Sequence, residues 1–231
     1  MSDSKVILIT GASSGIGAAV ARHAVAAGHA VVLAARGEDA LARLEQDLGE
    51  PGRVQSVRCD VTEWDDVQRL AGSALARFDR IDAVFANAGF GGTRGFTEST
   101  PEHWRQMILT NVYGVALTIR ATIAAIRESQ GHYVLTGSVA GRKALPGSVY
   151  SATKWAVSAM GESLRQELNG TGARVMLVEP GVVDTPFYDN GSPIQAPLTA
   201  DDTARIILFA LQQPPHVDIN ELLVRPTSQD E

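Results

Sequence analysis

A tyrosine and a lysine four residues apart form the most chemically informative pair in the sequence. Tyr150 and Lys154 stand in the run Tyr-Ser-Ala-Thr-Lys, and Ser138 precedes them in Thr-Gly-Ser. In a helix, residues four apart project from one face, one turn from each other. A lysine ammonium near a phenol favours the phenolate and lowers the tyrosine pKa from its reference of about 10. A helix-surface pair is the alternative for Tyr-x-x-x-Lys alone, but with Ser138 the pattern predicts an acid–base catalyst.

A glycine-rich turn near the N-terminus predicts a phosphate-binding element. It follows an apolar run and reads Thr10-Gly11-Ala12-Ser13-Ser14-Gly15-Ile16-Gly17. We expect Gly11 to permit the tight turn, Gly15 to let the backbone approach a pyrophosphate, and Gly17 to let the next helix pack closely. The helix N-terminus supplies N–H donors and partial positive charge, so Ser13, Ser14 and Ile16 are also predicted cofactor contacts. A tight turn without a ligand is the alternative for the glycines alone.

The residues after the second apolar run indicate which dinucleotide is bound. In NAD-binding proteins, an Asp or Glu about twenty residues past the turn hydrogen-bonds the ribose 2′-OH. Here the run ends Ala-Ala-Arg-Gly, and the guanidinium of Arg36 could bind a 2′-phosphate, with the Ser13 hydroxyl beside it. Glu38 and Asp39 suit the start of the following helix. We therefore predict NADP(H), with a solvated surface arginine as the alternative for Arg36.

Short apolar runs alternate with helical patterns along the whole chain. The strands and helices that they predict would bring the residues named above together. The predicted strands are Val6–Thr10, Ala30–Ala34, Val54–Arg58, Ala83–Ala86, His132–Thr136, Arg174–Val178 and Glu221–Val224. The predicted helices are Gly15–Ala27, Glu38–Leu48, Trp64–Arg77, Pro101–Ser129, Val149–Leu168 and Ala200–Leu211. This alternation predicts an α/β fold, a Rossmann-type doubly wound sheet of seven parallel strands with helices on both faces. We expect one domain over residues 1–231, with ligands at the carboxyl ends of the strands.

The Gly-x-x-x-Gly-x-Gly turn and the Tyr-x-x-x-Lys pair together resemble the short-chain dehydrogenase/reductase family, in its short single-domain branch. The resemblance covers nearly the whole chain. It implies that Tyr150 exchanges a proton with the substrate oxygen and that Ser138 hydrogen-bonds the same oxygen. It also implies that Lys154 lowers the tyrosine pKa and holds the nicotinamide ribose. Asn111 would kink the long helix and anchor a proton-relaying water, with an ordinary solvated asparagine as the alternative.

The same resemblance implies further cofactor contacts. Asp60 would meet the adenine amino group beside Val61, although Asp60 could instead open the next helix. The element Asn87-Ala88-Gly89 would steady the central sheet and line the cofactor. The element Pro180-Gly181, with Val183 and Thr185, would bind the nicotinamide carboxamide. Ala86 stands where the family often has Asn, and plain turns are the alternative for both elements.

Three loops are expected to wall the substrate pocket: Phe90–Phe96, Val139–Gly147 and Pro186–Pro197. Arg94, Arg142 and Lys143 offer positive charge there, so a carboxylate-bearing substrate is conceivable, although each cation could simply be solvated. The hydride itself would be supplied or accepted by the nicotinamide cofactor, and not by a side chain of the pocket.

Composition narrows the class of protein further. The net charge is −6 and no basic block occurs, which disfavours nucleic-acid and membrane-surface partners. Cys59 is the single cysteine, so no intrachain disulfide or cysteine metal site is expected, and no metal is predicted. We expect no signal peptide or membrane span, a cytoplasmic location and a homotetramer or homodimer.

The leading interpretation is an NADP(H)-dependent alcohol dehydrogenase or carbonyl reductase acting on a small molecule. A non-catalytic NADP(H)-binding sensor on the same fold is the alternative. A sugar-nucleotide epimerase of the longer branch is disfavoured, because no substrate domain is present.

Overall fold

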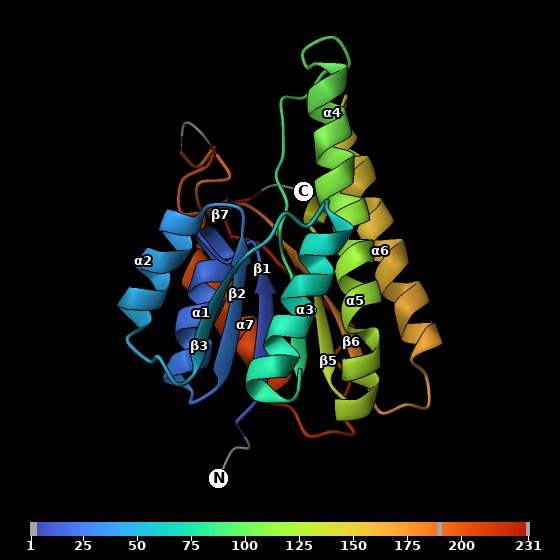
Figure 1. The fold of residues 1–231 in the computed structure, drawn as a ribbon. Coiled ribbons are helices and arrows are strands. Elements are labelled where there is room, and N and C mark those ends of the chain that lie inside the picture. The colour runs from blue at the N-terminus through green and yellow to red at the C-terminus, as the bar shows by residue number, and fades with distance from the viewer. Residues whose placement is uncertain (1–3, 189–190, 230–231) are drawn as a thin grey trace.

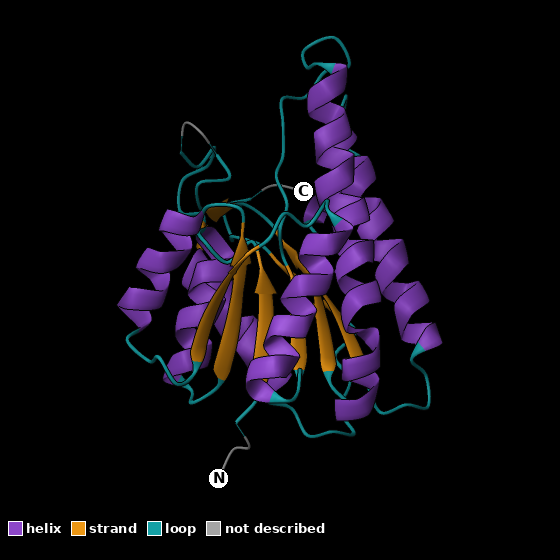
Figure 2. Ribbon diagram, viewed as in Figure 1, coloured by secondary structure: helices purple, strands orange, loops and turns teal. Residues whose placement is uncertain are grey.

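A parallel sheet of seven strands forms the centre of the molecule (Figures 1 and 2). The structure, a computed structural model, describes residues 4–188 and 191–229. The strand order is β3-β2-β1-β4-β5-β6-β9, and each neighbouring pair is parallel. The strands are β1 (Val6–Thr10), β2 (Ala30–Ala35), β3 (Val54–Arg58), β4 (Ala83–Ala86), β5 (His132–Thr136), β6 (Arg174–Pro180) and β9 (Glu221–Val224). The predicted fold class is confirmed.

Helices cover both faces of this sheet. They are α1 (Gly15–Ala26), α2 (Glu38–Leu48), α3 (Trp64–Phe78), α4 (Pro101–Ile108), α5 (Gly114–Ser129), α6 (Val149–Glu167) and α7 (Ala200–Leu211). One hydrophobic cluster joins the sheet to α1, α2 and α7, and a second joins it to α3, α5 and α6. Because both faces are covered, β1 is buried along its whole length, which is why its sequence is continuously apolar.

The long predicted helix over 101–129 contains a local irregularity. A π-helical turn, η1 (Leu109–Tyr113), separates α4 from α5 and contains Asn111. Such turns usually occur within α-helices as single bulges, frequently at functional sites. The predicted bend near Asn111 therefore takes the form of a π-bulge in an otherwise continuous helix.

The segment Pro101–Ser129 is also long and apolar enough to cross a membrane, judged by length and composition alone. We expected no such segment from the sequence. Leu117, Ile119 and Ile126 of this segment lie in the core cluster against the sheet. Packing within the protein therefore accounts for its apolar composition.

The carboxyl ends of all seven strands lie at one edge of the sheet. The chain leaves β1 toward β2 on one side, and the next strand on the other side of β1 is β4. Ligands of open parallel sheets bind at such a reversal of strand order. A short pair of strands, β7 (Val183–Asp184) and β8 (Leu198–Thr199), and the 3-10 turn η2 (Val139–Gly141) also lie beyond strand ends, and the sequence did not predict them.

Candidate active site

A cleft of about 1260 Å³ opens at this edge and brings together most of the predicted site residues. The predicted residues that line it are Gly11, Ser13, Ser14, Gly15, Ile16, Arg36, Asp60, Val61, Asn87, Ala88, Gly89, Ser138, Tyr150, Lys154, Pro180, Gly181, Val183 and Thr185. Gly17 and Asn111 lie outside the lining. Residues 189 and 190 of the predicted loop Pro186–Pro197 lie outside the described residues.

The glycine turn is shaped as a phosphate cradle. Gly11 and Gly15 have φ values of +65° and +53°, in a backbone region that residues other than glycine rarely adopt. A Cβ on Gly17 would lie 2.3 Å from the Gly11 carbonyl oxygen, so this glycine lets α1 pack against the turn. The N-cap residue Ser14 makes no side-chain capping bond, which leaves the first N–H groups of α1 available to an anion. The turn therefore fits a dinucleotide pyrophosphate.

Asn87 fastens this turn to the centre of the sheet. Its side-chain amide donates to the carbonyl oxygens of Thr10 and Gly11, each at 3.2 Å. Its amide oxygen accepts from the hydroxyl of Thr136 at 3.3 Å. The Thr10 hydroxyl in turn accepts from the backbone N–H groups of Asn87 and Ala88. Asn87 thus links β1, β4 and β5, which is more than a plain turn requires.

Arg36 lies at the end of β2, exposed at the cleft. Among the described residues it makes no hydrogen bond or ion pair to another side chain. The nearby carboxylate of Glu38 is 3.7 Å from the guanidinium of Arg58 on β3. Arg36 is therefore a cation of the cleft lining without an ion-pair partner among the described residues.

Asp60 lies in the turn before α3 and also lines the cleft. One of its carboxylate oxygens accepts from the N–H of Thr62 at 3.0 Å and from its hydroxyl at 2.8 Å, which shapes the turn before α3. The same residue lines the cleft next to Val61. Cys59, which precedes it, is 1% exposed, and burial raises its pKa to about 12, so the thiol stays protonated.

The three predicted catalytic side chains converge on the cleft. Tyr150 lies in the first turn of α6, and the Lys154 ammonium is 5.6 Å from the centre of its ring. That ammonium donates to the Thr136 carbonyl oxygen at 2.7 Å. The Ser138 side chain accepts from the N–H of Ala140 at 3.1 Å and lies close enough to the phenol of Tyr150 to lower its pKa. A phenol, a hydroxyl and an ammonium therefore share one small volume.

The direction of the tyrosine pKa shift differs from the prediction. Burial raises the pKa of Tyr150, and the hydrogen bond from Ser138 only partly opposes this effect. The net direction is therefore opposite to the predicted lowering, because burial has the largest effect on this phenol. Burial also lowers the pKa of Lys154 to about 8. The phenol is therefore held in its protonated form.

Asn111 is buried, which excludes the solvated alternative. It is 1% exposed. Its side chain donates to the Phe90 carbonyl oxygen at 2.9 Å and to the Thr153 hydroxyl at 3.1 Å, and it accepts from the Phe90 N–H at 3.0 Å. Asn111 thereby ties the loop after β4 to the catalytic helix.

The substrate side of the cleft is aromatic. The Phe187 ring centre is 5.5 Å from that of Tyr150 and 5.1 Å from that of Tyr188. A Cβ on Gly91 would lie 2.5 Å from the Phe187 ring, so the loops after β4 and β7 are in contact above the tyrosine. This arrangement offers apolar surface to a substrate.

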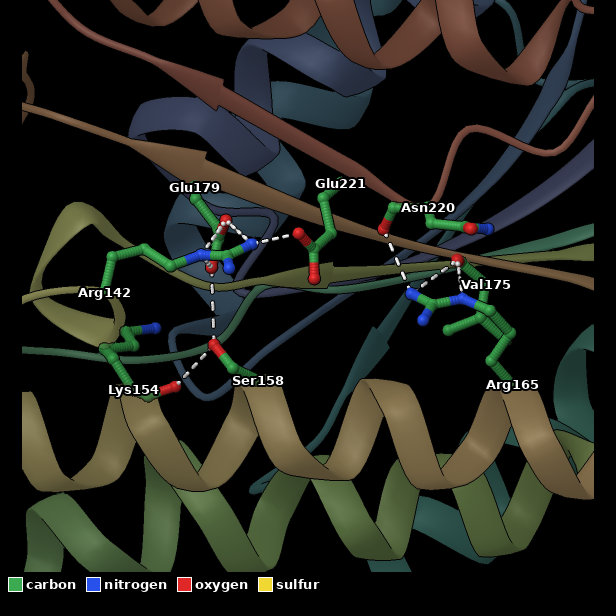
Figure 3. Close-up of polar contacts among 8 residues, drawn as sticks. All are labelled: Arg142, Lys154, Ser158, Arg165, Val175, Glu179, Asn220 and Glu221. Carbon is green, nitrogen blue, oxygen red and sulfur yellow. Dashed lines mark hydrogen bonds and ion pairs between the residues drawn. The ribbon is translucent and has the colours of Figure 1, made fainter.

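Arg142 does not offer the free positive charge that we expected. Its guanidinium pairs with the carboxylates of Glu179 and Glu221 (Figure 3), which raise its pKa above the usual range. Arg94 and Lys143 are exposed at the cleft and make no ion pair with a described residue. Glu179 was not predicted as a partner of Arg142, although a carboxylate inside the buried run Arg174–Pro180 is an unusual feature of the sequence.

Comparisons with known proteins agree with this geometry. A family profile described as short chain dehydrogenase matches residues 5–193. An uncharacterized oxidoreductase of Listeria monocytogenes is 37% identical over 241 residues, covering 97% of each chain.

Solved structures are similar over the full length. The alcohol dehydrogenase of Thermococcus sibiricus, complexed with 5-hydroxy-NADP, has a TM-score of 0.92 at 31% identity, covering 99% of each chain. A serine dehydrogenase complexed with NADP⁺ has a TM-score of 0.90 at 30% identity, covering 98% of this chain and 96% of that chain. A 3-ketoacyl-(acyl-carrier-protein) reductase of Brucella melitensis, complexed with NADH, has a TM-score of 0.86 at 27% identity, covering 97% and 98%.

Proposed function

The chain belongs to the short-chain dehydrogenase/reductase family of oxidoreductases, and from this premise we propose an NADP(H)-dependent alcohol dehydrogenase or carbonyl reductase. The enzyme transfers a hydride between nicotinamide and a carbonyl or secondary alcohol carbon. The observation that carries this proposal is the convergence of Ser138, Tyr150 and Lys154 in the cleft that contains the glycine turn.

Tyr150 is the general acid in the reductive direction. A tyrosine, with a reference pKa of about 10, is protonated at neutral pH and can donate its proton to a carbonyl oxygen placed beside it. The hydroxyl of Ser138 hydrogen-bonds the same oxygen and fixes its position. When bound, the reduced nicotinamide supplies the hydride. Asn111 holds the loop after β4 in place and, we propose, supports the water chain that returns a proton to the site.

The residues of the cleft fit the separate parts of NADP(H). The N-terminus of α1 would bind the pyrophosphate, and Arg36 with Ser13 the 2′-phosphate. Asp60 and Val61 would hold the adenine, and Lys154 the nicotinamide ribose. The backbone from Pro180 to Thr185 would hold the carboxamide. Two of the similar structures were solved with NADP or its derivative and one with NADH, so the preference for NADP(H) depends on Arg36.

A non-catalytic sensor is the weaker alternative. A protein that only senses NADP(H) needs the cradle and Arg36 but has no use for a serine, a tyrosine and a lysine brought together beside it. The shared position of Ser138, Tyr150 and Lys154 in the lining of the cleft favours an enzyme.

We also propose a cytoplasmic homo-oligomer, a tetramer or a dimer, that acts on small molecules and not on nucleic acid or membranes. A groove along α3, α5 and α6 supports the oligomer. It is lined by Trp64, Ala116, Ile119, Ile123, Met160 and neighbouring residues. The exposed side chains of Tyr113 and Trp155 add apolar surface on the helices that flank it.

Spectrophotometric assays with the purified protein test the proposal. NADPH is supplied with a panel of aldehydes, ketones and keto acids, and NADP⁺ with secondary alcohols, each repeated with the non-phosphorylated coenzyme. We expect turnover with at least one carbonyl and faster turnover with NADPH. Tight NADPH binding without any turnover would instead support the sensor, and failure to bind either coenzyme would contradict both functions.

A further inference from the structure

A fully buried carboxylate lies behind the candidate active site (Figure 3). Glu179 is 0% exposed and immediately precedes Pro180 at the end of β6. Both of its oxygens accept from the Nε of Arg142 at 2.8 Å, and Nη2 of the same guanidinium is 2.7 Å from Oε2. The Ser158 hydroxyl is 3.3 Å from Oε1. The proposed reaction assigns no role to this cluster.

Each partner of this carboxylate comes from an element that carries a site residue. Arg142 caps the η2 turn, which begins directly after Ser138. Ser158 lies on α6 one turn after Lys154, and its hydroxyl is 3.2 Å from the Lys154 carbonyl oxygen. Glu179 therefore joins the serine loop to the helix that carries the tyrosine and the lysine.

The contacts around the cluster leave little room for these elements to slide. A Cβ on Gly137 would lie 2.7 Å from Cγ of Glu179. A Cβ on Gly141 would lie 2.9 Å from the Lys154 carbonyl oxygen and 3.1 Å from the Ser158 hydroxyl. Two glycines thus allow the η2 turn to pack directly on β6 and on α6, and the ion pair fixes it there.

The charges of the cluster argue against a role in substrate binding. The Arg142 guanidinium also pairs with Glu221 at the start of the edge strand β9, so two carboxylates face one cation. A buried ion pair is often no more stabilising than apolar residues of the same volume. What this ion pair adds over apolar residues is orientation, because the planar guanidinium of arginine fixes the direction of its hydrogen bonds as well as their length.

We propose that Glu179 and Arg142 are positioning residues, which set the Ser138 hydroxyl against the Tyr150 phenol by locking the η2 turn to α6. This inference rests on the proposed function for its effect on catalysis. Neither side chain contacts the substrate in this account. They act through the backbone that presents Ser138 and through the helix that presents Tyr150.

Arg165 provides a matched control for Arg142. It extends from α6, and its guanidinium donates to the carbonyl oxygens of Val175 on β6, at 3.4 Å, and of Asn220 before β9, at 3.1 Å (Figure 3). It joins α6 to β6 and to the residue before β9, at the opposite end of β6 from Pro180, and none of these hydrogen bonds reaches the η2 turn. Arg142→Met and Arg165→Met therefore each remove a guanidinium that joins neighbouring elements. Only the guanidinium of Arg142 belongs to the loop that carries Ser138.

We expect Arg142→Met to lower kcat roughly 10- to 100-fold, the cost of a misplacement of about 1 Å at a reacting group. The dissociation constant of NADPH should stay near that of the wild type. Arg165→Met should lower the melting temperature while kcat stays near that of the wild type. Arg142→Lys should recover part of the lost kcat, because lysine keeps the charge but not the fork.

Hydrogen exchange measures the same positioning without turnover. In Arg142→Met, the backbone amides of residues 137–143 should exchange faster than in the wild type, whereas Arg165→Met should leave this segment unchanged. Wild-type kcat and wild-type exchange in Arg142→Met would overturn the inference, as would equal losses of kcat in both arginine variants. If the wild type shows no turnover, the proposed function fails, and exchange at residues 137–143 still decides whether Arg142 fixes the turn.

Discussion

Burial sets the protonation of the two central side chains of the cleft. It raises the pKa of Tyr150 and lowers that of Lys154 to about 8, because the charged form of each loses hydration inside the protein. A protonated phenol is prepared to give its proton to a carbonyl oxygen. The positive charge of oxidised nicotinamide would favour the phenolate of Tyr150 and so lower its pKa. Reduction of a carbonyl needs the phenol and oxidation of an alcohol needs the phenolate, so the two directions of the reaction favour opposite shifts of this pKa.

Lys154 should reduce the stability of the protein. Its folded-state pKa of about 8 lies below the usual 10.5, so the unfolded chain binds more protons than the folded one between about pH 8 and pH 10.5. Stability therefore rises as the pH increases from about 8 to 10.5, and the full penalty is present below pH 8. We expect Lys154→Met to raise the free energy of unfolding at neutral pH by about 1–3 kcal/mol, while activity is lost.

Urea unfolding of both proteins at several pH values measures this effect. The difference between variant and wild type should shrink as the pH rises above 8. A variant that is less stable than the wild type at pH 7 would contradict the account.

Arg36 should determine the coenzyme preference. Loss of a charged hydrogen bond to a phosphate costs about 1.5–3 kcal/mol, so Arg36→Asp should weaken NADPH binding roughly 10- to 100-fold. NADH binding should change much less. Arg58→Asp makes the same change of charge on the next strand, outside the cleft lining, and should leave the preference unaltered. Fluorescence titrations of both variants with both coenzymes decide the matter, and an unchanged preference in Arg36→Asp would count against NADP(H) specificity.

Single residues could be predicted from the sequence where their chemistry depends on local spacing. Ser138, Tyr150 and Lys154 follow from one strand end and one helix turn, and the structure brings them together. The state of Arg142 could not be predicted, because its partners Glu179 and Glu221 are distant in the sequence. The direction of the Tyr150 shift was wrong for a similar reason, since burial depends on tertiary packing.

At the scale of elements, close packing of α1 against the glycine turn determines whether a pyrophosphate can bind. Gly17→Ala would place a methyl group 2.3 Å from the Gly11 carbonyl oxygen and 2.9 Å from the Asn87 side-chain amide. We expect it to abolish NADPH binding and to destabilise the protein by roughly 1–3 kcal/mol, the usual cost of overpacking.

Gly72→Ala is the control for this substitution. Gly72 lies within α3, and nothing stands within 4 Å of an added Cβ. It should bind NADPH normally and gain roughly 0.5–1 kcal/mol, because alanine favours a helix. Calorimetric titration and thermal unfolding measure both properties. Normal NADPH binding by Gly17→Ala would contradict the proposed cradle.

The boundaries of regular elements could be predicted closely, because buried parallel strands and amphipathic helices have strong periodic patterns. The π-turn η1, the 3-10 turn η2 and the pair β7 and β8 were not predicted. These short elements depend on contacts such as those of Asn111 with Phe90 and of Ser138 with Ala140. They are also the elements that place the site residues.

At the scale of the whole molecule, parallel strands bring distant segments to one edge. The glycine turn, Asn87, Ser138 and Gly181 follow four different strands that are neighbours in the sheet. This could be predicted from the order of strands and helices alone. The assembly of several chains could not, because it depends on surfaces whose partners the sequence does not specify.

The proposed oligomer can be tested at the groove along α3, α5 and α6. Ile123→Glu places a charge in the groove lining, whereas Ala124→Glu places the same charge on the exposed part of α5 outside that lining. We expect Ile123→Glu to reduce the mass in analytical ultracentrifugation and Ala124→Glu to leave it unchanged. A wild-type protein that sediments as a monomer would contradict the proposed assembly.

Turnover of the Tyr150→Phe variant tests the central claim most directly. The variant loses only the phenolic oxygen, so NADPH should bind as it does to the wild type in a fluorescence titration. With a carbonyl substrate that the wild type reduces, we predict that kcat falls by at least 10²–10⁴-fold, the contribution expected of a general acid. A Tyr150→Phe variant that binds NADPH and reduces that substrate at a rate close to the wild type would contradict the account.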